Sequence, residues 1–389
     1  MTDTPARILL LGTHGQYNIG DELLLETFLH QLGDQHSYVI NTYDPADTAA
    51  RLGSRYQFSL INTAGDRWAL LQHLRRADAL VFAGGSILKE LSAATGRNRY
   101  STLLMILAIV TAARWLGRAP LAMLNIGVGP IRTPRGRRLA GMILNRVNFV
   151  AVRDEASAEL CRTIGVKTNV ISSTDAVLSV TPEWLLGSST VGTRAPGGPL
   201  RIALSLNHDI EVPENWEHVM ATLSQAMREL ASERPIEVHG LPMQSRGKTH
   251  DDATVLREFA ARMPEVTFVE HLPNDHHDVA GLIASCDVLV AERLHAIITS
   301  AKLGVPVVPL VYDIKVREVA RSLGIDDLGI DLGTPFEASA VTHSITRVAD
   351  DLPAARARLA EKVDALTMRA RSSFDGARAW LAARGRTTA

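Results

Sequence analysis

The sequence predicts an α/β fold with two doubly wound, Rossmann-like domains that face a cleft. With 389 residues, the chain is longer than one hydrophobic core usually supports. Short apolar runs alternate with longer amphipathic segments, which is the pattern of parallel sheets covered by helices. A stretch rich in Pro, Gly, Ser and Thr at 181–199 interrupts this alternation, which then resumes.

The predicted elements follow from these runs. In the first half, residues 22–32 and 137–147 have helical periodicity, and four apolar runs predict strands at 8–11, 79–82, 121–126 and 149–152. In the second half, strands are predicted at 202–206, 236–238, 267–269, 288–290 and 305–310. The predicted organisation is an N-terminal domain at 1–182, a linker at 183–199, a C-terminal domain at 200–352 and a helical segment at 353–389 that packs back on the first domain.

The longest apolar run, residues 103–113, is too short to cross a bilayer and predicts a buried helix. Arg97, Arg99, Arg114 and Arg118 flank this run, so a peripheral contact with a membrane is compatible with the sequence. The first seven residues lack the order of charged, apolar and small residues that marks a signal peptide. We therefore expect a cytoplasmic protein, with the inner face of the membrane as one place where it can act.

Composition excludes some functions. Lys and Arg total 41 against 42 Asp and Glu, so no overall field attracts nucleic acid, and we expect no nucleic-acid-binding function. The two cysteines, Cys161 and Cys286, lie among apolar residues and are interpreted as buried thiols of a reducing compartment.

Glycines and polar residues gather where predicted strands end, which is where open parallel sheets bind ligands. The loop after the first strand is neither a Walker A motif nor G-x-G-x-x-G. In that loop Asp21 is either a helix N-cap or a contact for the acceptor, and both interpretations stay open. The cleft candidates are His14, Gln16, Asn18, Asp21, Gly84, Gly85, Gly127, Gly129 and His239.

The strongest group of residues lies in the second half. Arg293 and His295 stand where a strand gives way to a helix predicted at 296–302, whose first N–H groups attract anions. Lys315 follows the next strand, so the three side chains are expected to converge on one small, highly charged ligand. Surface charges beside a polar turn are the alternative for each residue alone.

The ordered set of motifs resembles the polysaccharide pyruvyltransferase family. The matching segments run from the first loop to Lys315, in the order of the family: 18–22 (NIGDE), 83–86 (AGGS), 126–130 (IGVGP), 153–155 (RDE), 174–176 (TDA), 239–240 (HG), 293–296 (RLHA), 304–306 (GVP) and 312–315 (YDIK). One departure is Ala83, which occupies the first position of a turn that often carries three glycines in the family.

The resemblance implies a two-domain fold similar to glycosyltransferase type B, phosphoenolpyruvate as donor and a sugar diol as acceptor. The implied products are a pyruvate ketal on a cell-surface polysaccharide or its precursor, and phosphate. Carried over to this sequence, Arg153 and Lys315 hold the donor, Arg293 is a second anion contact and His295 is the general acid/base.

The chemistry fits these residue types. Phosphoenolpyruvate carries a carboxylate and a phosphate, so several cations must meet it. Protonation of its methylene carbon and deprotonation of the sugar need one group that titrates near neutral pH, as His does. The scheme needs no cofactor and no metal. The segment 271–278 holds His271, His276 and His277, but its spacing matches no standard metal pattern and indicates a polar loop.

The sequence is also compatible with two other functions. A glycosyltransferase of the same fold would use a nucleotide sugar, with Glu292 on the ribose, and a degenerate family member would bind without turnover. Further acceptor candidates are Arg97, Asn98 and Arg99, in a loop at 92–100 that is hypothesised to close over substrate. The acceptor sugar, its attachment to a lipid and the oligomeric state are not specified by the sequence.

Overall fold

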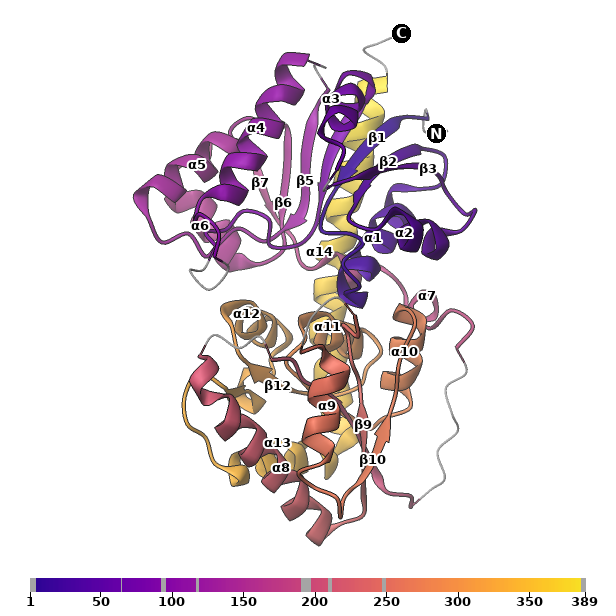
Figure 1. Ribbon diagram of the computed structural model, residues 1–389, viewed down its shortest axis with the longest axis vertical. Helices are drawn as coiled ribbons and strands as arrows, with labels where there is room; N and C mark the ends of the chain where they lie inside the picture. Colours follow the sequence, from indigo (N-terminus) through magenta and orange to yellow (C-terminus); the bar gives the residue numbers. More distant parts are fainter. Residues whose placement is uncertain are drawn as a thin grey trace. The chain divides into compact units, whose positions relative to one another are not determined.

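A computed structural model of the protein describes residues 5–63, 65–91, 96–116, 119–189, 197–208, 212–246 and 250–385. The described residues form two parallel sheets with helices between their strands (Figure 1). The chain divides into two compact units. The first comprises Met1–Gln16, Asp21–Ser179 and the chain from Leu366, and the second comprises Tyr17–Gly20 and Val180–Ala365.

The first unit contains a seven-stranded sheet in the order β3-β2-β1-β4-β5-β6-β7. Its strands are β1 (Arg7–Leu11), β2 (Ser37–Thr42), β3 (Gln57–Asn62), β4 (Ala79–Ala83), β5 (Leu121–Ile126), β6 (Phe149–Val152) and β7 (Val170–Ser172). Its helices are α1 (Ile19–Leu32), α2 (Pro45–Leu52), α3 (Arg67–Arg76), α4 (Ser101–Leu116), α5 (Pro134–Leu144), α6 (Glu155–Thr163) and the 3-10 helix η2 (Ala176–Ser179).

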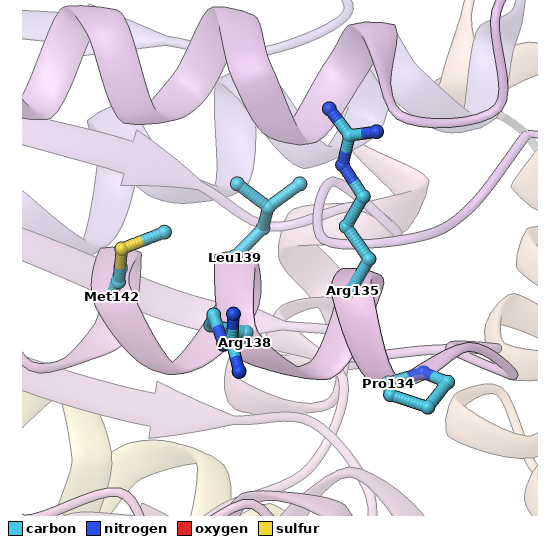
Figure 2. A pocket seen from close by; sticks show the side chains of 5 residues that line it. All are labelled: Pro134, Arg135, Arg138, Leu139 and Met142. Carbon is cyan, nitrogen blue, oxygen red and sulfur yellow. The ribbon is translucent and has the colours of Figure 1, made fainter.

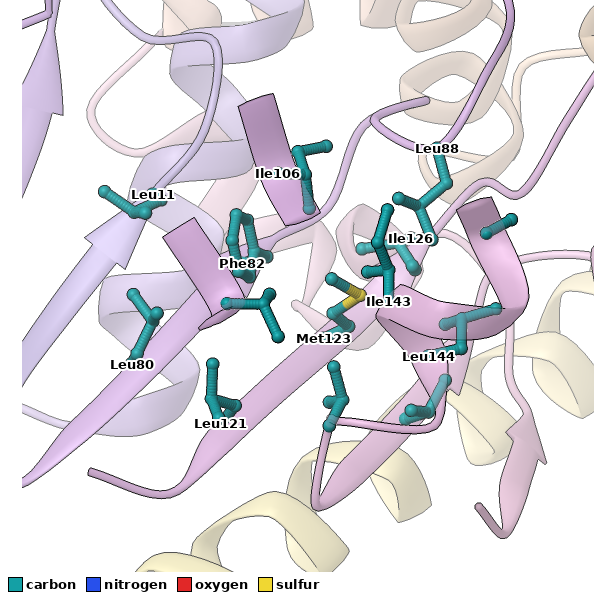
Figure 3. Packing of buried hydrophobic residues seen from close by; sticks show 14 of the residues in the cluster. Leu11, Leu80, Phe82, Leu88, Ile106, Leu121, Met123, Ile126, Ile143 and Leu144 are labelled. Atoms are coloured by element: carbon teal, nitrogen blue, oxygen red, sulfur yellow. The ribbon is translucent and has the colours of Figure 1, made fainter. Parts of the chain in front are cut away.

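Helices cover both faces of this sheet, which is why its central strands are mostly apolar and do not alternate with polar residues. On one face, side chains of β1, β4, β5 and β6 pack with those of α3, α4, α5 and α6 (Figure 3). On the other face, Phe28 of α1 meets Phe374 of α14 (Leu352–Gly385) edge to face, with ring centroids 5.4 Å apart.

The second unit contains a six-stranded sheet in the order β10-β9-β8-β11-β12-β13. Its strands are β8 (Leu200–Ser205), β9 (Ile236–Gly240), β10 (Thr267–Glu270), β11 (Val288–Ala291), β12 (Val307–Val311) and β13 (Ile330–Asp331). Its helices are α7 (Pro182–Leu186), η3 (Pro213–Asn215), α8 (Trp216–Glu233), α9 (Asp252–Ala260), α10 (His276–Ala284), α11 (Leu294–Lys302), α12 (Ile314–Leu323), η4 (Asp326–Leu328) and α13 (Ala338–Ala349).

All nine strands expected from the sequence are present, with ends close to those expected. Four further strands, β2, β3, β7 and β13, did not stand out as apolar runs. Residues 353–385 of the expected C-terminal segment form most of α14, which contributes to the second unit up to Ala365 and to the first unit from Leu366. Parts of the expected linker (190–196) and of the loop 92–100 (92–95) lie outside the described residues.

The expectation of a buried helix at 103–113 is confirmed for one face of α4 and wrong for the opposite face. Leu103, Ile106 and Val110 are buried, but Met105 is 53% exposed and Trp115, at the end of the helix, is 87% exposed. The periodicity of a uniformly apolar segment does not reveal which side meets the core, so the error follows from the sequence pattern itself. Of the helices described, none combines the length and apolar character that a bilayer crossing requires.

Candidate functional site

The carboxyl ends of β8 and β11 mark the point in the second sheet where the strand order reverses. Strands are added outward from β8 toward β10 on one side and from β11 toward β13 on the other. Such a reversal point opens a crevice beyond the strand ends, which is where open α/β sheets bind ligands. In this chain Asn207 follows β8, and Glu292 and Arg293 follow β11.

Arg293 is held by a buried carboxylate. Its Nε donates to Asp252 Oδ2 at 2.9 Å, and a second guanidinium nitrogen donates to Asp252 Oδ1. Burial works to lower the pKa of Arg293, but Asp252, Tyr312 and Glu292 outweigh it and the pKa is raised. The guanidinium is therefore a permanent cation in a fixed orientation, and much of its charge is already compensated.

The same carboxylate organises the turn after β9. Asp252 Oδ2 also accepts from the backbone N–H groups of Met243, at 3.0 Å, and Gln244, at 3.1 Å. Asp252 is 1% exposed, so it is a buried ion with its charge fully engaged.

The first motif of the sequence docks on this turn. Asn18 forms an antiparallel bridge with Gln244, and the N–H of Ile19 donates to the carbonyl of Met243 at 2.9 Å. Asn18 also accepts from the N–H of Gly20 through its side-chain oxygen, at 3.0 Å. Residues 17–20 thereby belong to the second unit although they follow the first strand of the first unit.

Gly20 lies directly against the ring of His295. A Cβ on Gly20 would stand 2.3 Å from Nδ1 of His295 and 2.8 Å from Cγ, closer than any real contact. His295 is in the first turn of α11, which begins slightly earlier than expected, at Leu294. The structure thus brings together two motifs from opposite halves of the sequence, Asn18–Gly20 and Arg293–His295, through the turn at Met243 and Gln244.

Gly20→Ala should lower turnover by about 10–100-fold, because the added methyl group forces the His295 ring out of position and small misplacements are costly in catalysis. Gly141→Ala is the matched control, since a Cβ there finds its nearest neighbour at 3.8 Å. The control should keep full turnover. Equal activity of both variants in a phosphate-release assay would mean that the contact between Gly20 and His295 has no role in the reaction.

Lys315 lies in the first turn of α12, beyond the carboxyl end of β12. Its Nζ is 3.0 Å from Oδ2 of Asp313, and Asp313 caps α12 by accepting from the N–H of Val316. Because β11 and β12 are neighbours in the sheet, the starts of α11 and α12 stand at the same edge. Lys315 and Arg293 therefore lie on adjacent strand ends, each beside a carboxylate.

Glu292, the residue expected to bind the ribose of a nucleotide sugar in the alternative function, lies in the protein interior. It is fully buried, and its Oε2 accepts from the backbone N–H of Asn207 at 3.2 Å and from the Asn207 amide at 3.0 Å. Burial raises the pKa of Glu292 well above its ordinary value. This carboxyl group holds the ends of β8 and β11 together and is not presented to a ligand.

His239, at the end of β9, pairs with another histidine. Its Nδ1 is 3.0 Å from Nε2 of His271, and the two rings are stacked. Burial lowers the pKa of both. The expected polar loop at 271–278 is partly packed, since the ring of His276 is stacked on Trp184. Within the described residues no group of three or more His, Cys, Asp and Glu is arranged to hold a metal ion.

Arg153 belongs to the first unit. It follows β6, is 8% exposed, and donates to Ser86 Oγ at 2.9 Å and to Asp154 at 3.3 Å. A Cβ on Gly127 would come within 3.0 Å of Arg153 Nε and 3.1 Å of Ser86 Oγ. A side chain at position 127 would therefore crowd the contact between Arg153 and Ser86.

The other three glycines predicted to line the cleft differ in how closely neighbouring side chains pack against them. Gly84 has φ +61°, and a Cβ there would lie 3.0 Å from Phe28 of α1, so packing of α1 on the sheet accounts for it. Gly129 is close to Leu160 of α6 in the same way. Gly85 has φ +72°, and a Cβ there would have only one atom within 4 Å, at 3.8 Å, so its backbone conformation and not a close neighbour accounts for the glycine.

His14 and Glu22 are buried titratable groups near the end of β1. Glu22 Oε1 accepts from the N–H of Gly15 at 2.7 Å, and burial raises the pKa of Glu22 to about 7. His14 is 1% exposed, and burial lowers its pKa to about 4 against a smaller, raising effect of the Asp21 backbone. Both side chains are therefore uncharged in the folded protein over part of the acidic pH range.

These two pKa shifts act in opposite directions on stability. Between pH 4.5 and 7 the folded chain keeps a proton on Glu22 that the unfolded chain loses, so the free energy of unfolding falls as pH rises. Between pH 4 and 6.5 the unfolded chain binds a proton on His14 that the folded chain does not, so the free energy of unfolding rises with pH.

Glu22→Gln should therefore expose the contribution of His14. We expect the variant to gain stability from pH 4 to 6.5 by up to about 3 kcal/mol more than the wild type does, at about 1.4 kcal/mol for each unit of pKa shift. Urea unfolding at several pH values measures this, with Glu26→Gln on the same helix as control. An identical pH profile in Glu22→Gln and wild type would contradict the assignment.

The interpretation of Asp21 as the cap of the first helix is wrong. Helix α1 begins at Ile19, so Asp21 lies inside its first turn, where a carboxylate still favours the positive end of the helix dipole. The earlier start follows from the docking of Ile19 on Met243, a contact that local sequence does not show. Gln16 is exposed at the end of the first loop.

Sequence reasoning missed two residues of these sites, Asp252 and Asn207, and gave no role to Ser86 although it lies in the motif 83–86. A signal for Asp252 exists, because it is in helical register with the buried Val255, Leu256 and Phe259. An acidic residue on the apolar face of a helix is unusual and calls for a buried partner. Asn207 carries no comparable signal in the sequence.

Comparisons with known proteins agree on the fold and on one family. A family model described as polysaccharide pyruvyl transferase matches residues 18–314. The amylovoran biosynthesis protein AmsJ of Erwinia amylovora is 25% identical over 292 residues, which are 69% of this chain and 65% of that protein. The chain thus spans less than two-thirds of the length of this relative.

Two solved structures illustrate the fold. A UDP-GlcNAc 2-epimerase from Neisseria meningitidis is similar with a TM-score of 0.58 at 12% identity, covering 91% of this chain and 93% of the other. A glycosyltransferase from Rickettsia africae has a TM-score of 0.58 at 12% identity, covering 96% of this chain and 98% of the other. At such low identity the likeness concerns the fold alone, and it confirms the predicted pair of Rossmann-like domains of the glycosyltransferase type B kind.

Proposed function

The chain belongs to the polysaccharide pyruvyl transferase family, and we propose that it transfers the pyruvyl group of phosphoenolpyruvate to two hydroxyls of a sugar. The product is a pyruvate ketal on an exopolysaccharide or its precursor. The biosynthetic role named for the relative from Erwinia amylovora supports an acceptor of this class. A lipid-linked acceptor and a cytoplasmic place of action stay predictions.

The observation that carries the proposal is the contact of Gly20 with His295 beside the fixed Arg293. Both motifs lie within the segment that matches the family, and they meet at the strand edge where α/β sheets bind ligands. A histidine next to a buried, oriented cation suits proton transfer to and from an anionic substrate.

In the proposed reaction, His295 as imidazolium protonates the methylene carbon of phosphoenolpyruvate, and positive charge develops on the carbon that bears the phosphate ester. A first sugar hydroxyl attacks this carbon and loses its proton to the neutral imidazole. The bond from carbon to the phosphate oxygen then breaks, the second hydroxyl closes the ketal, and its proton goes to the departing phosphate. One donor and one diol thus become one ketal and one phosphate.

The cations take different parts in this scheme. Lys315 and the first backbone N–H groups of α11 are the contacts for one anionic group of the donor. The donor contact that the resemblance implies for Arg153, in the first unit, stays a prediction. Arg293 uses its Nε and one terminal nitrogen on Asp252, so its main part is to orient the start of α11, and its outer edge is left for the donor.

The test is phosphate release from phosphoenolpyruvate in the presence of a panel of mono- and oligosaccharides, together with melting temperatures. Acceptor-dependent release and a melting temperature raised by phosphoenolpyruvate are expected. Inorganic phosphate at the same concentration is the control for simple anion binding. No release with any acceptor and no shift with phosphoenolpyruvate, together with a shift by nucleotide sugars, would overturn the proposal.

A glycosyltransferase that uses a nucleotide sugar is less well supported. Its ribose would need an accessible acidic residue in the second unit, and the candidate Glu292 is fully buried with Oε2 bonded to Asn207. The likeness to an epimerase of UDP-GlcNAc concerns a shared fold and does not select the donor.

A further inference from the structure

Helix α4 exposes an unusual amount of apolar surface. Among the described residues, nine large hydrophobic side chains are exposed, and four of them lie on this one helix: Leu104, Met105, Trp115 and Leu116. Helix α3, which packs beside α4, adds Trp68 as a fifth. Single exposed apolar residues are common on proteins, but such a concentration on one element marks a contact surface.

The exposed residues form one face of the helix. Leu103, Ile106, Val110 and Ala113 point into the core of the first unit. On the opposite side a shallow open groove runs from Leu104 to Leu116 and is lined by residues at helical spacing. Apart from Arg114, no residue of α4 is charged.

The chain around this helix is strongly basic. Residues 91–153 contain ten arginines and no Asp, Glu or Lys, although the whole chain is balanced at 41 basic and 42 acidic residues. Helix α5 packs beside α4 and exposes Arg135, Arg137 and Arg138. Figure 2 shows Arg135 and Arg138 on α5, where they line a surface pocket. The preceding carboxylate, Glu90, is bonded to the backbone N–H of Thr133 at the start of α5.

We propose that the exposed faces of α4 and α5 form a docking surface for an anionic lipid bilayer. This surface is defined by Leu104, Met105, Trp115, Leu116, Arg135 and Arg138. A tryptophan and aliphatic side chains enter the boundary between head groups and acyl chains, and arginines beside them bind lipid phosphates. Because all charges in the segment 91–153 are positive, an anionic surface is favoured over a second copy of this chain, which would bring the same arginines together.

The surface does not depend on the chemistry of the donor, so its test is separate from that of the proposed function. The full chain is sedimented with vesicles of phosphatidylcholine mixed with phosphatidylglycerol, and with vesicles of phosphatidylcholine alone. We expect binding to the anionic vesicles that is at least about tenfold tighter and that weakens in high salt.

Two double variants test the apolar and the basic contributions to vesicle binding separately. Met105→Ser with Trp115→Ser removes apolar contacts, and Arg135→Gln with Arg138→Gln removes charge; each should weaken vesicle binding about tenfold. The matched controls are Leu272→Ser with Met368→Ser, which are similarly exposed elsewhere, and Arg356→Gln with Arg358→Gln on α14. The controls should bind as the wild type does.

Three results would overturn the proposal. One is equal binding to both kinds of vesicle, and another is vesicle binding that the surface variants leave unchanged while their melting temperatures match the wild type. The third is the lack of vesicle binding together with a dimer, seen by light scattering, that Met105→Ser with Trp115→Ser dissociates. That third result would assign the surface to a second copy of the chain.

Discussion

His295→Ala lowers the rate of ketal formation by about 10²–10⁴-fold if the imidazole is the general acid/base, because this is what a positioned proton-transfer group usually contributes. The fold should survive, since His295 is only partly buried and stands in the first turn of α11. The measurement is phosphate release at saturating phosphoenolpyruvate and acceptor, beside a thermal melt of the variant.

Two further variants separate chemistry from packing at this position. His295→Gln refills the space against Gly20 without a group that titrates, so it should be as inactive as His295→Ala. His343→Ala, on the exposed side of α13, is the matched control and should keep full turnover. Near-wild-type turnover of folded His295→Gln would remove His295 from the reaction.

Asp252→Ala is the substitution expected to destabilise the second unit most. It leaves the guanidinium of Arg293 buried without its partner and removes the acceptor for the N–H groups of Met243 and Gln244. Breaking a buried pair from one side typically costs about 3–5 kcal/mol. Equilibrium urea unfolding measures the loss, and turnover should fall with it because the same turn holds residues 18–20.

The control is an ion pair on the surface of the same unit. Glu318→Ala breaks the pair with Arg321, which is 56% exposed, and should cost at most about 1 kcal/mol. Replacing both partners, as in Asp252→Leu with Arg293→Leu, leaves no buried charge unpaired and should recover part of the stability. Activity should not return, because the double variant lacks the Arg293 guanidinium. A loss in Asp252→Ala no larger than that of the control would contradict the part assigned to this carboxylate.

The sequence by itself predicted the fold class and most strand positions, because central strands buried on both faces leave long apolar runs. There are physical reasons why four strands were not predicted. β3 is an edge strand with alternating exposed residues, and β2, β7 and β13 hold only short apolar stretches, so none of them produces such a run. Local pattern also located the strand ends that carry Arg153, Arg293, His295 and Lys315, since polar residues follow these strands directly.

Only the tertiary structure decided which of these residues meet. The contact of Gly20 with His295 and the bond of Ile19 to Met243 join segments that are far apart in the sequence, and no local periodicity encodes such a pairing. The partner of Arg293 likewise comes from α9, a different helix that precedes it in the chain. The exposed face of α4 has the same origin: an apolar helix is determined by its sequence, but the side that meets the core is determined by the sheet on which it packs.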